Sequence, residues 1–278
     1  MTPPAPFFRR VCLISGNTLL EALRQRLFHF LLLLALALVV GAQWLRDFNF
    51  GAPELKFLAD FGFGAMAFFG AALTITATAQ LFFSEIENRT VLTLLAKPVG
   101  RADFVLGKFL GAIGVVAVFC GLLTALLAVV LWSRETALMQ EWPEAFARGR
   151  LLHYEAIVAA GLIQWSKLAV LAAFTLLIAS FAQSQLYTVV AGFFVLVICH
   201  LQYLAQESYA RSASVIAHLL SGGLGLLFPN FQLFNLADDV GTGGPLAWSR
   251  FVQVELYALG YCVAACALAI YSFRKRQI

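Results

Sequence analysis

Six long apolar runs divide the chain. Each run holds enough hydrophobic residues to cross the roughly 30 Å hydrocarbon core of a bilayer as a helix, which takes about 20 residues. Most charged residues fall in the shorter segments between the runs. The pattern predicts an all-α polytopic membrane protein, with one transmembrane domain over residues 1–278 and six transmembrane helices. These helices are expected at residues 28–45, 59–83, 109–132, 157–183, 187–204 and 251–273.

Two further apolar stretches are too short or too amphipathic to span a membrane. Residues 214–228 contain Gly222, Gly223 and Gly225, which favours an external re-entrant or interfacial hairpin. Near the amino end, Thr18 and Glu21 have the spacing of a capping box, which predicts a helix that begins at Thr18. Its leucines share one face. This helix is expected to be an amphipathic N-terminal interfacial helix on the cytoplasmic side, or a simple amphipathic leader.

The composition excludes a soluble globular protein. Hydrophobic residues make up 61% of the chain and charged residues 12%, whereas soluble domains have about 45–50% and 25%. The first apolar run, which follows Arg9 and Arg10, ends like a signal peptide but reaches spanning length, so it is interpreted as an uncleaved helix. The five cysteines form no C-x-x-C pair and the four histidines are far apart in sequence. No metal site or disulfide framework is therefore indicated.

Charge is distributed unevenly between the two predicted sides. The side with both termini carries eleven Lys and Arg residues against four Asp and Glu, whereas the opposite segments carry seven against eleven. Because Lys and Arg accumulate in short cytoplasmic segments, both termini are predicted to be cytoplasmic. The net charge of +4 then reflects orientation in the lipid bilayer, and no nucleic-acid partner is indicated.

The most informative segment, residues 85–101, joins the second and third predicted spans. Residues 89–97 place apolar side chains on one face of a helix and polar ones on the other. Pro98 ends this helix, and Asp103 falls in the first turn of the next one, where a carboxylate complements the helix dipole. A helix of about nine residues is only about 14 Å long and cannot cross a bilayer. It is expected on the cytoplasmic face, either as a simple turn or as a surface on which a partner acts.

This segment resembles the pattern of ABC-2 type transporter permeases, and most closely the branch labelled multicopper-enzyme maturation permeases. Two other stretches agree in order and spacing, namely residues 60–62 at the start of the second span and residues 227–235 before the last span. The resemblance covers most of the chain and is weakest at residues 133–152. It rests on the acidic residues before Arg89-Thr90, on Lys97-Pro98-Val99 and Arg101, and on Gly107-Lys108-Phe109-Leu110-Gly111.

The resemblance implies the transmembrane permease subunit of an ATP-binding-cassette (ABC) transporter. Such a subunit moves a substrate, here in the export direction, using ATP hydrolysis by a separate ATPase subunit that binds ATP and Mg²⁺. The implied partners are that ATPase and a second permease chain, as a homodimer or heterodimer, in a prokaryotic inner membrane. Residues 214–235 would form external re-entrant helices. The short cytoplasmic helix would be the coupling helix, with its ATPase-coupling residues at Glu85, Glu87, Arg89, Thr90, Leu92, Leu95, Pro98 and Arg101.

The chain carries no convincing nucleotide site of its own. The nearest match to a phosphate-binding loop, at Gly100, Gly107 and Lys108, has six residues between the glycines instead of four, and Phe109 replaces the required Ser or Thr. No enzymatic activity and no bound cofactor are therefore expected in this chain. The alternative function is a secondary transporter or channel without an ATPase partner, which needs charges or broken helices at mid-membrane.

Two ionisable residues are candidates for a transport path. Lys167 is expected about 6 Å inside the outer edge of the fourth span, where its amine can extend outward to water. Asp60 opens the second span, where its carboxylate can cap the helix. Each of these residues either has that structural role or contacts the substrate.

Overall fold

The computed structural model describes residues 6–45, 54–87, 100–146, 149–210, 223, 225–235 and 248–275. Within these ranges the chain is helical and contains no strand, which confirms the all-α prediction. Two short 3₁₀ helices, η2 (Pro143–Phe146) and η3 (Phe231–Phe234), accompany seven long helices. These are α1 (Phe7–Leu23), α2 (Arg26–Gly41), α3 (Glu54–Glu87), α5 (Arg101–Glu141), α6 (Tyr154–Phe181), α7 (Gln185–Ala210) and α10 (Trp248–Lys275).

The number of candidate membrane spans agrees with the predicted six if α1 and α2 are counted as one. Five helices, α3, α5, α6, α7 and α10, are long and apolar enough to cross a membrane separately. Helices α1 and α2 pass the same test only together, and they are bent by 64° relative to each other. Since α2 has 16 residues, it is about 24 Å long, which is shorter than the hydrocarbon core. The first predicted span thus corresponds to α2, which reaches spanning length only together with α1, and the bent pair is a broken span or a re-entrant loop.

The predicted start of the N-terminal helix is wrong. Helix α1 begins at Phe7, with Pro6 at its N-cap, so Thr18 lies well inside it. Thr18 is 2% exposed because it packs against α5 instead of capping a helix end. The helix breaks later, after Leu23, and the chain then turns into α2. The Thr18–Glu21 spacing alone could not distinguish a cap from two residues inside a longer helix.

Glycines on α5 allow α1 to approach it closely. A Cβ atom at Gly107 would lie 2.5 Å from the Ile14 side chain, and one at Gly111 would lie 2.5 Å from that of Thr18. These distances are too short for any side chain, so the two backbones can meet only because both positions are glycine. The Gly-Lys-Phe-Leu-Gly sequence at 107–111 thus fixes α1 against the start of α5.

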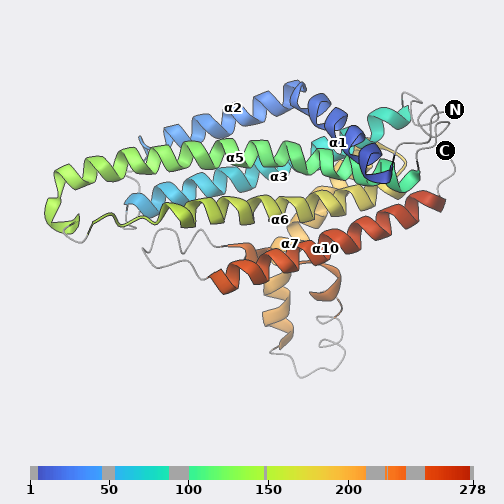
Figure 1. Ribbon diagram of the computed structural model, residues 1–278. Coiled ribbons are helices and arrows are strands. Elements are labelled where there is room, and N and C mark those ends of the chain that lie inside the picture. The colour runs from blue at the N-terminus through green and yellow to red at the C-terminus, as the bar shows by residue number, and fades with distance from the viewer. Residues whose placement is uncertain are drawn as a thin grey trace.

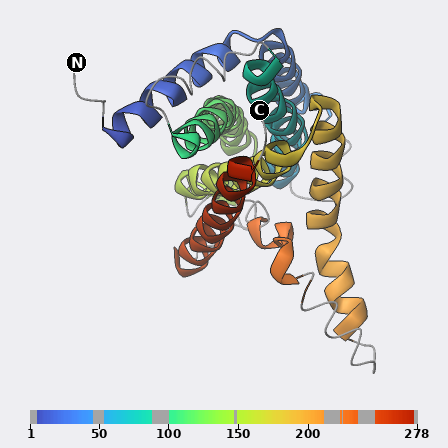
Figure 2. The same ribbon diagram turned by 90° about the vertical axis from the view of Figure 1, so that its right-hand side faces the viewer.

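Helices α3, α5 and α6 form the centre of the bundle (Figure 1). Helix α10 packs against α6, α1 against α5, and α2 against α3. Helix α7 diverges from this bundle, and η3 lies in the angle between α6, α7 and α10 (Figure 2). The apolar window of α7 is only 22% buried, against 67% for that of α6. One face of α7 is therefore open to lipid or to another chain.

Two central helices are longer than the predicted spans at 59–83 and 109–132. Helix α3 has 34 residues and α5 has 41, which corresponds to about 51 Å and about 61 Å. Both exceed the roughly 30 Å hydrocarbon core, so their ends project beyond it. Hydropathy identifies only the part of a helix that lies in lipid, whereas the projecting turns are stabilised by polar contacts.

Residues 133–152, where the resemblance was weakest, include the last turns of α5 and are organised by a buried carboxylate. Glu135 is fully buried and accepts hydrogen bonds from the backbone N–H groups of Leu151 and Leu152, at 2.8 and 3.0 Å, and from the Tyr154 hydroxyl, at 2.6 Å. Arg150 pairs with the same carboxylate at 3.2 Å. Glu135 thus fixes the return of the chain into α6, which the sequence analysis missed.

Candidate functional site

The start of α5 is anchored by a buried aspartate. Asp103 lies in the first helical turn, as predicted, and is 2% exposed. Its Oδ2 accepts a hydrogen bond from the backbone N–H of Gly100 at 3.0 Å, and it pairs with Arg10 Nε of α1 at 2.7 Å. Because two elements far apart in sequence hold this carboxylate, the entry of the chain into α5 has a fixed direction.

A buried lysine links the end of α3 to α5. The Lys108 side chain is 2% exposed, and its Nζ lies 2.5 Å from Glu85 Oε1 and 4.0 Å from Glu21 Oε2. The Ser84 hydroxyl contacts Glu21 as well, at 3.4 Å. A buried charge requires a counter-charge at close range, which Glu85 supplies here. The lysine therefore holds three helices, α1, α3 and α5, at one level of the bundle.

The C-terminal end of α10 joins this group through Arg101. Its guanidinium Nη1 donates hydrogen bonds to the backbone carbonyls of Phe273, at 3.3 Å, and of Arg274. Carbonyls at a helix C-terminus lack partners within the helix and carry partial negative charge, so a guanidinium is a favourable partner for them. We call the residues Arg10, Glu21, Glu85, Arg101, Asp103 and Lys108 the helix-end cluster.

The helix-end cluster brackets the predicted coupling segment. Glu85 lies near the end of α3 and Arg101 begins α5, so both predicted residues are located in the cluster. Glu87 is the last residue of α3. The remaining predicted coupling residues lie outside the described residues, and so does the predicted helix at 89–97; they are Arg89, Thr90, Leu92, Leu95 and Pro98. The assignment of a coupling helix thus stays a prediction.

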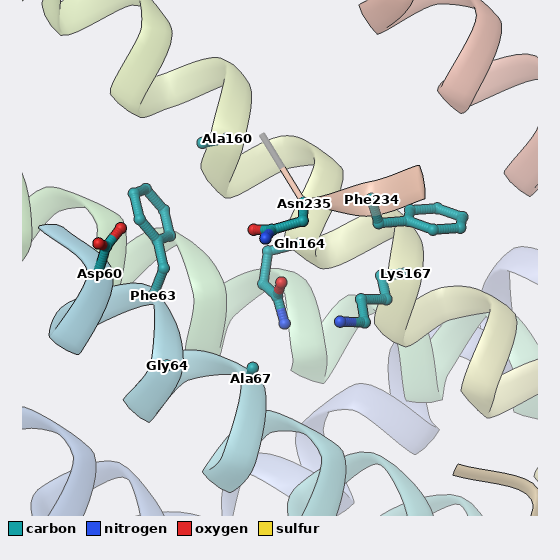
Figure 3. Close-up of a pocket in the computed structure, with 9 residues that line it drawn as sticks. All are labelled: Asp60, Phe63, Gly64, Ala67, Ala160, Gln164, Lys167, Phe234 and Asn235. Carbon is teal, nitrogen blue, oxygen red and sulfur yellow. The ribbon is translucent and has the colours of Figure 1, made fainter. Parts of the chain in front are cut away.

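A polar cavity between α3, α6 and η3 brings both transport-path candidates together. It has a volume of about 280 Å³, and Asp60, Gln164 and Lys167 are among the residues that line it (Figure 3). A second cavity of about 580 Å³ lies between α3, α6 and α7 and shares Gln164 and Lys167 with the first. Its other walls are mainly apolar. The two cavities therefore form one groove with a polar end and an apolar end, which we call the α6 groove.

The amine of Lys167 is directed into the α6 groove. Lys167 is the fourteenth of the 28 residues of α6, and its side chain reaches toward α3 together with that of Gln164 (Figure 3). Its Nζ lies 5.4 Å from the ring centroid of Phe231 in η3, which is a cation–π contact. In the described part of the chain, no carboxylate oxygen lies within 4 Å of this amine.

Asp60 does not have the predicted capping position. Helix α3 begins at Glu54, so Asp60 is its seventh residue and lies in the second turn. It is exposed, and it lines the polar cavity on the opposite side from Lys167 (Figure 3). The predicted span begins at Ala59, whereas the helix itself begins at Glu54, in a turn that contains the charged residues Glu54 and Lys56.

Gln164, Phe231 and Asn235 are among the lining residues that were not identified from the sequence. Gln164 is 7% exposed, and its amide nitrogen has no hydrogen-bond partner. Its occurrence inside an apolar span was the available signal, since a buried amide needs partners. Phe231 and Asn235 belong to the 227–235 stretch noted for its resemblance, but their contact with α6 depends on the tertiary fold.

The fold described above is that of a polytopic α-helical membrane protein with five to six spans. A family model described as "ABC-2 family transporter protein" matches residues 13–278. The chain therefore belongs to the ABC-2 family, and it is a membrane component of an ABC transporter, as the resemblance implied. A search of curated proteins found no significant match.

Proposed function

We propose that this chain is an export permease driven by ATP hydrolysis in a separate ATPase subunit. The observation that carries the proposal is the family match over residues 13–278, which extends across all the described helices except the first turns of α1. In this proposal two permease chains enclose the transport path and the ATPase binds at the end of the bundle that holds the helix-end cluster. That end faces the cytoplasm of a prokaryotic cell, together with both termini.

The helix-end cluster supports a coupling role for residues 85–101. A segment transmits force to a bundle only if both of its ends are attached to more than one helix. At one end, Glu85 of α3 pairs with Lys108 of α5. At the other end, Asp103 pairs with Arg10 of α1, and Arg101 binds the end of α10. Movement of this segment would therefore displace α1, α3, α5 and α10 together.

The alternative function is a secondary transporter or channel, for which the α6 groove would be the binding site. Such proteins bind their substrate or coupling ion in the membrane, and Lys167 is an ionisable residue in the middle of α6. An ATP-driven permease also needs a substrate site, so the groove is compatible with both mechanisms. The two candidates differ in whether transport requires an ATPase subunit.

The test replaces Leu92 and Leu95, the apolar residues of the predicted coupling helix, by Asp. The Leu92→Asp/Leu95→Asp variant removes up to roughly 3–6 kcal/mol of potential apolar burial and introduces charge into any apolar contact. Because these residues lie outside the spanning helices, we expect normal membrane insertion and loss of both ATPase co-purification and ATP-dependent transport. A Thr93→Asp variant, which adds a charge on the polar face of the same segment without removing an apolar side chain, is the matched control.

Wild-type ATPase assembly and transport in the Leu92→Asp/Leu95→Asp variant would contradict the coupling assignment. Transport that continues in the absence of any ATPase subunit would instead favour the secondary transporter or channel. The two outcomes can be told apart. The first tests whether residues 85–101 bind the ATPase subunit, and the second tests whether transport requires ATP hydrolysis.

A further inference from the structure

The polar end of the α6 groove contains two hydrogen-bond donors for which the described residues supply no matching acceptor. Gln164 is only 7% exposed, and its amide nitrogen has no hydrogen-bond partner in the structure. The Lys167 amine contacts the Phe231 ring, but among the described residues no carboxylate lies within 4 Å of it. A π face satisfies only part of the needs of a cation and offers no hydrogen bond to its three N–H groups.

Both donors come from one turn of α6 and point to the same space. Gln164 and Lys167 are three residues apart, which places them on the same face of the helix, and Figure 3 shows both side chains extending toward Gly64 and Ala67 of α3. A buried donor without an acceptor is costly, and so is a cation inside a membrane helix. An anionic group with acceptor oxygens would relieve both costs at once, through charge-assisted hydrogen bonds.

The other end of the groove is suited to an apolar chain. The cavity of about 580 Å³ adjoins the polar one, with which it shares Gln164 and Lys167, and its walls include Phe68, Phe193 and Val197. These three side chains are 71%, 40% and 51% exposed, so the groove is open along its length. The groove as a whole falls within the usual range of ligand sites, about 300–1,000 Å³.

We infer that the α6 groove binds an anionic amphiphile, with the acidic head group on Lys167 and Gln164 and the acyl chain along α3 and α7. This inference rests on the proposed transport function and specifies its substrate class. Asp60 lines the same cavity, but it lies on the side opposite Lys167, which leaves the positive end to the anion (Figure 3). The open apolar end admits a chain from the lipid phase without passage through water.

The test measures equilibrium binding of radiolabelled oleoyl lysophosphatidic acid to the purified full-length chain in neutral detergent. Mono-olein, which differs only by lacking the phosphate, and inorganic phosphate, which lacks the chain, serve as competitors. We expect lysophosphatidic acid to compete at least about ten-fold better than either. Lys167→Met and Gln164→Leu should each weaken binding by about ten-fold or more, because each removes a donor to a charged group.

Matched controls separate the proposed head-group site from general effects of charge. Lys56→Met removes a lysine of α3 that lines neither cavity, so it should leave binding unchanged. Lys167→Arg should retain most of the binding, because the charge is kept. Asp60→Asn should leave binding equal or tighter, since it removes a negative charge from the cavity. Size-exclusion chromatography checks that each variant is folded, and Gln164→Leu carries the test if Lys167→Met is not.

Several results would overturn the inference. Equal competition by mono-olein would show that the head group is not recognised, and equal competition by phosphate would indicate a site for a free anion. Loss of binding in Asp60→Asn with retention in Lys167→Met would indicate a cationic ligand. If Lys167→Met instead changed the oligomeric state measured by light scattering, the groove would be an interface between two chains.

Failure of this inference is distinguishable from failure of the proposed function. The binding assay contains no ATPase subunit, so the Leu92→Asp/Leu95→Asp variant should bind lysophosphatidic acid like the wild type. Loss of ATPase assembly in that variant, with normal amphiphile binding, supports both proposals. Normal assembly with normal amphiphile binding removes the coupling assignment and leaves the groove as a binding site.

Discussion

Lys108 and Lys167 both lie more than a turn inside long apolar helices, and their surroundings differ. Lys108 of α5 is 2% exposed and lies 2.5 Å from the Glu85 carboxylate, so its charge is compensated within the chain. Lys167 of α6 contacts an aromatic ring and lines a groove. A compensated buried charge contributes to structure, whereas a partly buried charge at a cavity is a candidate for ligand binding. The difference between the two cannot be seen in their flanking sequences.

At this scale we predict that Lys108→Met destabilises the folded protein. The change removes the Lys108 ammonium from Glu85 and Glu21, and loss of one member of a buried pair costs about 3–5 kcal/mol. Since the Glu85 side chain is 21% exposed, we expect about 2 kcal/mol here. Thermal unfolding followed by size-exclusion chromatography in detergent should show a midpoint lowered by several degrees.

The double variant Lys108→Met/Glu85→Gln provides the control for this pair. It removes both charges, so it should recover part of the lost stability. A Lys108→Met protein as stable as the wild type, or a double variant less stable than both single variants, would argue against Lys108 as the link between α3 and α5.

At the scale of helices, the contact between α1 and α5 depends on the absence of side chains. A Cβ atom at Gly111 would lie 2.5 Å from Thr18 and 3.1 Å from the backbone oxygen of Ser15. The Ser15 contact involves backbone, so the strain cannot be relieved by a side-chain rotation alone. Helix α1 must therefore move away from α5 if Gly111 is replaced, and the Arg10–Asp103 pair between the same helices would be disturbed.

We predict opposite effects for the same substitution at two positions of α5. Gly111→Ala should lower the thermal unfolding midpoint, because overpacking costs about 1–3 kcal/mol. Gly121→Ala is the matched control. A Cβ there meets nothing within 4 Å, so the higher helix propensity of alanine should leave the midpoint unchanged or raise it. Equal midpoints for the two variants would mean that α1 is not held closely against α5.

At the scale of the whole molecule, the two ends of the bundle differ in charge and in the polar contacts that hold their helices together. The helix-end cluster joins α1, α3, α5 and α10 near both described ends of the chain. The opposite end is organised by Glu135 and by the pair between Arg134 and Glu54, at 2.5 Å. The excess of Lys and Arg at the helix-end cluster side predicts that this side is cytoplasmic.

Cysteine labelling tests this orientation. In a variant without the five native cysteines, a cysteine at Glu141 should react with an impermeant reagent on intact cells, since Glu141 is an exposed residue at the end of α5. A cysteine at Asn88 should react only after the membrane is permeabilised. Protection at position 141 together with reaction at position 88 on intact cells would invert the topology and place the helix-end cluster outside.

The sequence by itself determined the class, the approximate positions of the spans and the family. Hydropathy is a local property, and a run of about 20 apolar residues has few stable alternatives to a membrane helix. The position of Asp103 in a first helical turn was also readable, because it depends on near neighbours along the chain.

Only the tertiary structure decided which polar residues meet. Glu135 became buried because residues 150–154 fold back on it, and Lys108 was paired because α3 ends beside α5. Gln164 and Lys167 became part of one groove because η3 and α7 pack beside α6. Such contacts join residues from separate helices, and their geometry follows from how whole helices pack, which no local pattern specifies.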